Sequence, residues 1–119
     1  MLPKQHRLTS TREFKALFAG GRTYVHRLLV LKVLPKKREQ PSRFGFLTSA
    51  KLGKAVLRSR ARRLLREAVR LLAPRLEQRG YDLALIARPA IREADFAEVS
   101  RAVEELFRRA GLLTSCERT

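Results

Sequence analysis

One segment, residues 51–70, constrains the fold of this chain more than any other. It reads KLGKAVLRSRARRLLREAVR, with eight basic side chains and one acid, and its apolar residues recur with the period of an α-helix. At 100° per residue, these share one side: Leu57, Ala61, Leu64, Leu65, Ala68, Val69, Leu71 and Leu72. The other side is largely arginine: Arg60, Arg62, Arg63, Arg66 and Arg70. We therefore expect a helix with one face in a core and the other facing a polyanion.

The charges at the start of this helix oppose the helix dipole. Four cations gather where the dipole favours acids: Lys51, Lys54, Arg58 and Arg60. A bound polyanion would relieve this conflict, which favours nucleic acid as the partner. The alternatives are a solvated arginine-rich face, or a helix that lies on an anionic membrane or a protein partner.

Composition supports a folded, nucleic-acid-binding domain. The chain has 27 Lys and Arg against 11 Asp and Glu, a formal net charge of +16 over 119 residues, which favours RNA or DNA as the usual neighbour. Its 45% hydrophobic residues, five prolines and six glycines are typical of a packed domain. We predict a single domain over residues 1–119, with frayed tails at 1–7 and 112–119.

The sequence also indicates the compartment. Cys116 is the only cysteine, so one chain can build neither a disulfide nor a cysteine-based zinc site. No apolar run approaches the ~20 residues that span a bilayer, and the first residues lack the apolar core of a signal peptide. We expect a cytoplasmic protein that does not enter a membrane.

The remaining patterns predict an α+β fold with the element order α-β-β-β-α-β-α. Ser10 and Glu13 have capping-box spacing before a first helix that ends at the Gly20-Gly21 pair. Strands are predicted at 23–26 and 28–34, or as one bent strand over both ranges, and at 43–49. The apolar run 83–87 indicates a central strand within 81–88. Asp95, with Glu98 three residues on, predicts a last helix that ends at Gly111. These elements would form a small mixed sheet packed against helices.

Signals for protein-borne catalysis are scarce. His6 and His26 lie on different predicted elements, and no spacing matches a metal site or a Gly-rich phosphate loop. A serine nucleophile would need a histidine base, and Ser49 has only Lys51 nearby. We predict no catalytic residue and no metal ligand on the protein.

Residues 51–70 resemble the signature of the protein subunit of bacterial ribonuclease P, in which a Lys-rich turn leads into an Arg-Asn-Arg motif and a basic helix. The likeness extends over most of the chain: HRLTSTREFKALFAGG is similar to the opening pattern of the family, RFGF to its third strand and YDLALIARP to its fourth.

The resemblance implies a small basic protein that joins a catalytic RNA to remove the 5′ leader of precursor tRNA. The RNA would carry out the endonucleolytic chemistry with Mg²⁺, and no obligatory protein partner is implied. The residues implied to contact that RNA are Lys51, Lys54, Arg58, Ser59, Arg60, Arg62, Arg63, Arg66 and Arg70.

The resemblance also implies a cleft for the single-stranded leader between the first helix and the sheet. Phe14 and Phe18 would be its aromatics, and Val30 and Lys32 would lie on its floor. Stacking on aromatics beside a basic groove can hold a single strand without reading its sequence. Phe14 and Phe18, at i and i+4, could equally be core anchors.

The sequence departs from the family pattern at two positions, and the family departs from a general rule. Ser59 replaces the family's Asn, and Lys32 stands where an aromatic is frequent, which would make the cleft more electrostatic. The family has a left-handed β-α-β crossover, so we expect the usual right-handed rule to fail in this chain.

Two other classes would explain the charge. A ribosomal or other structural RNA-binding protein suits the size and composition, but not the combination of an aromatic first helix with the Lys-turn-Arg-x-Arg pattern. A DNA-binding protein would need base-reading side chains on its recognition helix, and this helix has arginine at nearly every polar position.

Overall fold

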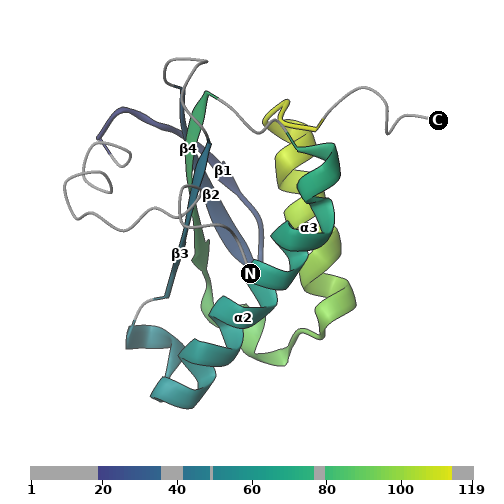
Figure 1. Cartoon of the computed structure of the whole chain (residues 1–119). Coiled ribbons are helices and arrows are strands. Elements are labelled where there is room, and N and C mark those ends of the chain that lie inside the picture. The colour runs from purple at the N-terminus through teal and green to yellow at the C-terminus, as the bar shows by residue number, and fades with distance from the viewer. Residues whose placement is uncertain (1–18, 36–41, 49, 77–79, 114–119) are drawn as a thin grey trace.

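The computed structural model describes residues 19–35, 42–48, 50–76 and 80–113. Two long helices, α2 (Ala55–Leu72) and α3 (Phe96–Arg109), lie together on one face of a four-stranded sheet (Figure 1). The strands are β1 (Arg22–Val25), β2 (Leu29–Pro35), β3 (Arg43–Leu47) and β4 (Tyr81–Ala87). Short 3-10 turns flank the helices: η2 (Ala50–Leu52), η3 (Ala73–Arg75) and η4 (Pro89–Glu93). The predicted first helix lies outside the described residues, except that Ala19 and Gly20 are helical.

The sheet is mixed, with the strand order β1-β2-β4-β3. β1 and β2 form an antiparallel hairpin, and β4 pairs with β2 antiparallel and with β3 parallel. Helix α2 connects β3 to β4, which is the long crossover that neighbouring parallel strands require. The central position predicted for the fourth strand is confirmed. The left-handedness of the crossover stays a prediction from the resemblance.

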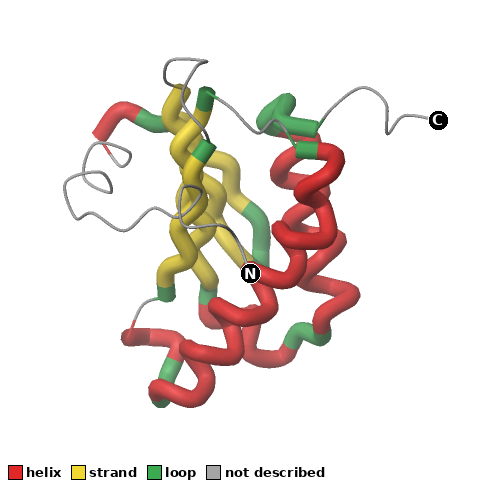
Figure 2. The backbone as a smooth tube through the Cα atoms, viewed as in Figure 1, coloured by secondary structure: helices red, strands yellow, loops and turns green. Residues whose placement is uncertain are grey.

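Alternation along the strands separates the two faces of the sheet. On β2, Leu29, Leu31 and Val33 are buried toward the helices, and on β4 Leu83 and Leu85 join them. Helix α2 packs over β3 and β4, while α3 packs over β1 and β2. Figure 2 shows both helices in red on the same side of the yellow strands. The core therefore lies between the sheet and a layer of two helices.

Helix α2 buries a narrower stripe than its sequence predicts. Its buried residues are Ala61, Leu65, Ala68, Val69 and Leu72. The periodicity predicts Leu71 on the same apolar side, but Leu71 is 53% exposed. It projects 100° away from Leu72 around the helix axis, beyond the surface that α3 and the sheet cover.

The ends of α3 follow local rules. The predicted capping box is confirmed: Asp95 Oδ1 accepts a hydrogen bond from the Glu98 amide at 2.9 Å, and Glu98 Oε1 accepts one from the Asp95 amide at 3.0 Å. At the other end Gly111 has φ 76°, and the amides of Gly111 and Leu112 donate to Arg108 and Phe107 carbonyls in a Schellman motif.

The predicted fraying from residue 112 is wrong for its first two residues. Leu112 is only 3% exposed, and Leu113 forms an isolated antiparallel bridge with Leu76. The Schellman turn reverses the chain after α3 and directs these two leucines back onto the core, where burial of a leucine contributes about 1.5–3 kcal/mol. The residues that follow, 114–119, and the predicted tail at 1–7 lie outside the described residues.

Candidate nucleic-acid interface

The turn before α2 presents two lysines at a helix end that has no acidic cap. Lys51 lies in η2, and Lys54 is the N-cap residue; both are exposed, and Lys54 makes no side-chain capping bond. Between them Gly53 adopts φ 120°, where a Cβ atom would lie 3.0 Å from Leu57 Cδ1. Only glycine fits this backbone without strain. Since the first turn of α2 contains no acid, the positive end of the helix dipole adds to the charge of both lysines.

The arginine side chains of α2 lie on three sides of the helix. Arg63 is exposed on the outer face with Ser59. On the flank toward β3, Arg62 donates from Nη1 to Thr48 Oγ1 at 3.2 Å, and Arg66 lies 5.8 Å from the centre of the Phe46 ring. On the opposite flank, Arg60 Nη2 donates to the Ala94 carbonyl at 3.0 Å. The helix therefore offers cations over about half of its circumference.

Ser59 makes a hydrogen bond with Arg62, about one turn further along α2. Its hydroxyl oxygen accepts a hydrogen bond from Arg62 Nη2 at 3.3 Å. Arg62 is thus held by two hydroxyls, those of Ser59 and Thr48, neither of which neutralises its charge. A serine at the family's asparagine position can in this way orient an adjacent guanidinium.

The residues predicted to bind RNA differ in whether a carboxylate compensates their charge. In the described part of the chain, no carboxylate forms an ion pair with the following cations: Lys51, Lys54, Arg58, Arg60, Arg62, Arg63 and Arg66. Arg70 differs, because its Nη2 lies 2.8 Å from Glu67 Oε1. The hydrogen bond from Arg70 lowers the pKa of Glu67, and the same bond raises the pKa of Arg70. Uncompensated charge is therefore concentrated in the first three turns of α2.

One cation of this region was missed by sequence reasoning. Arg92, in η4, donates from Nη1 to the Leu52 carbonyl at 3.2 Å, which places its guanidinium beside the turn that carries Lys51 and Lys54. Its side chain is exposed. In the sequence it stands 38 positions beyond Lys54 in a polar loop, and no motif links the two.

The predicted floor of the leader cleft lies on the other side of the sheet. Val30 and Lys32 pair with Ile86 and Ala84 of β4, on the face turned away from α2 and α3. Leu34 and Leu47 pack against Ala84 on this face. Phe14 and Phe18 lie outside the described residues.

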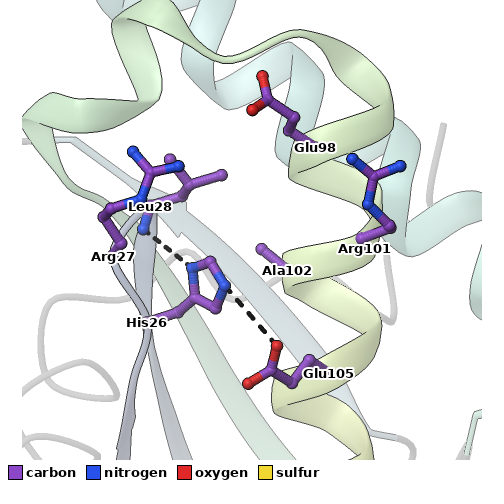
Figure 3. Close-up of a pocket in the computed structure, with 7 residues that line it drawn as sticks. All are labelled: His26, Arg27, Leu28, Glu98, Arg101, Ala102 and Glu105. Carbon is purple, nitrogen blue, oxygen red and sulfur yellow. Dashed lines mark hydrogen bonds and ion pairs between the residues drawn. The ribbon is translucent and has the colours of Figure 1, made fainter.

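A second polar feature, a hollow of about 270 Å³, lies between the β1–β2 turn and α3 (Figure 3). Its lining residues are His26, Arg27, Leu28, Glu98, Arg101, Ala102 and Glu105. His26 Nδ1 accepts a hydrogen bond from the Leu28 amide at 3.0 Å, and Nε2 lies 3.8 Å from Glu105 Oε1. No lining residue belongs to α2, and acids alternate with bases, so the hollow does not continue the basic surface.

The described residues offer neither a metal-binding cluster nor a membrane-spanning helix. In residues 19–35, 42–48, 50–76 and 80–113, no group of three or more His, Cys, Asp or Glu is placed to hold a metal ion. No helix within these same ranges is long and apolar enough to span a membrane.

These features define a class: a small α+β domain whose basic helix and preceding turn form a surface of uncompensated positive charge. The chain matches the family described as Ribonuclease P over residues 2–111. It is 49% identical over 112 residues to the ribonuclease P protein component of Symbiobacterium thermophilum, covering 94% of this chain and 96% of that protein. The corresponding protein of Caldanaerobacter subterraneus subsp. tengcongensis is 39% identical over 118 residues, with 99% and 100% covered.

The fold agrees with these matches. The ribonuclease P protein from Thermotoga maritima superimposes with a TM-score of 0.77 at 26% identity, covering 87% of this chain and 96% of that one. The chain belongs to the ribonuclease P protein family, whose known function is the 5′ maturation of tRNA. The family match decides against the ribosomal and DNA-binding alternatives.

Proposed function

We propose that the chain binds the catalytic RNA of ribonuclease P through the turn before α2 and the first three turns of that helix. The residues in contact would be Lys51, Lys54, Arg58, Ser59, Arg60, Arg62, Arg63 and Arg66. The observation that carries the proposal is that no carboxylate in the described part of the chain compensates these cations. Phosphates are then their counterions, and binding releases the cations condensed on the RNA.

In this proposal the RNA carries out the phosphodiester cleavage and holds the Mg²⁺ that the reaction uses. The protein supplies charge, which lowers the repulsion between the catalytic RNA and precursor tRNA, both polyanions. Because tRNA is transcribed in the cytoplasm of bacteria such as the relatives above, we place the complex there.

The face of the sheet opposite the helices would bind the leader of precursor tRNA. Val30 and Lys32 share this face, and a Cβ atom on Gly20 would lie 3.6 Å from Leu34 Cδ1, on the same face. Since Ala19 and Gly20 are helical, the end of the first predicted helix approaches this side of the sheet. This arrangement supports a groove between that helix and β2, with Phe14 and Phe18 as its proposed aromatics.

The test measures affinity for the RNA subunit of ribonuclease P from Symbiobacterium thermophilum over a range of salt concentrations. Seven cations that each neutralise one phosphate predict a log-log slope of about −5 to −6. An Arg58→Ala/Arg63→Ala variant should reduce the slope by about 1.4 to 1.8, while Arg101→Ala, in the hollow beside His26, should leave it unchanged.

Cleavage of precursor tRNA should require both the RNA subunit and Mg²⁺. An unchanged salt slope in the Arg58→Ala/Arg63→Ala variant would show that α2 is not part of the interface. Cleavage by a protein preparation shown to be free of RNA would overturn the assignment of catalysis to the RNA.

A further inference from the structure

Two arginine side chains link the η4 region to the η2–α2 region. One from each region donates to a backbone carbonyl of the other. Arg92, in η4, donates to the Leu52 carbonyl at 3.2 Å, and Arg60, in α2, donates to the Ala94 carbonyl at 3.0 Å. A Cβ atom on Gly53 would also lie 3.5 Å from Arg92 Nη1. The Arg92 guanidinium therefore lies against the turn that carries Lys51 and Lys54.

The backbone on both sides of this contact is anchored in the core. Leu52 and Ile91 are each 0% exposed, and Ala94 is buried. Arg92 itself is exposed, and its guanidinium is hydrogen-bonded to a carbonyl of this buried backbone. A guanidinium carries five N–H donors, and one bond to a carbonyl leaves most of them free for a further acceptor.

The charge of Arg92 is not neutralised within the described part of the chain. It donates a hydrogen bond to a carbonyl, and neither the neighbouring Glu93 nor any other described carboxylate forms an ion pair with it. A cation that is partly immobilised before binding loses less side-chain entropy when it meets a phosphate. The planar fork of arginine suits phosphate oxygens in particular.

We propose that Arg92 binds a phosphate of RNA beside Lys51 and Lys54, which extends the interface from α2 to η4. The proposal rests on the RNA-binding function proposed above. The phosphate could belong to the catalytic RNA or to precursor tRNA, and the two arms of the test distinguish them.

The test compares Arg92→Gln, Arg92→Lys and wild type. One arm measures binding to the transcribed RNA subunit of Symbiobacterium thermophilum ribonuclease P; the other measures binding of precursor tRNA to the reconstituted complex. Glutamine keeps an N–H donor for the Leu52 carbonyl but removes the charge, whereas lysine keeps the charge. Arg101→Gln is the matched control, because it removes the same charge from the hollow beside His26.

We expect Arg92→Gln to weaken binding about five- to eightfold at 0.1 M monovalent salt in at least one arm, since one contact contributes a factor of salt to the power −0.7 to −0.9. The salt slope should fall by the same 0.7 to 0.9. Arg92→Lys should bind within about twofold of wild type, and Arg101→Gln should match wild type.

Unchanged affinity and slope for Arg92→Gln in both arms would overturn the proposal. So would equal losses in the lysine and glutamine variants together with a lower melting temperature, because that result assigns Arg92 a structural role. An Arg63→Gln variant separates the two proposals. If it weakens binding and Arg92→Gln does not, only the role of Arg92 fails; if neither has an effect, the proposed contact of Arg63 with RNA fails as well.

Discussion

At the scale of single residues, the charge that a cation on this surface can offer to a phosphate depends more on whether a carboxylate pairs with it than on how exposed it is. Arg63 and Arg70 are both exposed on α2, but Arg70 forms an ion pair with Glu67 three residues earlier. Arg60 and Arg92 donate to carbonyls, and Arg62 donates to hydroxyls, so these three keep their full charge. The prediction that Arg70 contacts RNA stays a prediction, and the ion pair reduces the contribution expected from it.

Glu67→Gln should therefore strengthen RNA binding. The Arg70 hydrogen bond holds the pKa of Glu67 below its usual value, so the carboxylate is ionised at neutral pH and the pair is lost only when pH falls through that lowered pKa. Removing the carboxylate frees Arg70 for a phosphate, and affinity at 0.1 M salt should rise by up to about fivefold. The measurement is RNA affinity at pH 7, with Glu67→Gln/Arg70→Gln as the control. A gain that persists in this double variant would contradict the explanation.

At the scale of elements, the two faces of the sheet have different environments. One face of β2 enters the core through Leu29, Leu31 and Val33, while the intervening Val30, Lys32 and Leu34 point to the other side. A shift of one residue in the β2 register would exchange these sets. The proposed leader surface is thus fixed by the packing of the opposite face, even though its own residues are only half-buried.

Replacement of Phe14 or Phe18 by alanine tests this surface. If the ring lines the cleft, binding of leader-bearing precursor tRNA to the complex should weaken roughly five- to 150-fold, because stacking contributes about 1–3 kcal/mol per base. Binding of mature tRNA is the control, and it should hardly change. If the ring is instead a core anchor, stability should fall by about 3–5 kcal/mol, seen as a lower melting temperature. Equal losses of affinity for precursor and mature tRNA would indicate that the leader binds elsewhere.

At the scale of the whole molecule, the net charge of +16 makes the isolated protein repel itself. Salt screens this repulsion, so the melting temperature of the RNA-free protein should rise between 0.05 and 0.5 M NaCl. We expect a rise of roughly 5 °C, the shift that about 1 kcal/mol produces in a domain of this size. Salt should have the opposite effect on the complex, where it weakens RNA binding and the stabilisation that binding gives. A melting temperature of the free protein that falls with salt would contradict this account.

Local chemistry within the sequence determined most of the element pattern. The α2 periodicity, the Asp95–Glu98 capping box and the glycine that ends α3 each depend on residues within a few positions of one another. The interior position of β4 was also predictable, because its apolar run requires cover on both faces. The basic surface of α2 followed from the same periodicity, since the arginines occupy the positions that the core leaves exposed.

Tertiary structure alone decided which of these cations lack a carboxylate partner and which distant backbone groups they contact. Arg60 and Arg92 meet carbonyls 34 and 40 residues away in the sequence, and no local pattern encodes such contacts. The exposure of Leu71 and the burial of Leu112 likewise depend on how α2, α3 and the sheet pack together. Periodicity determines which side of a helix is apolar, but the width of the buried stripe and the partners at its edges are set only when the elements meet.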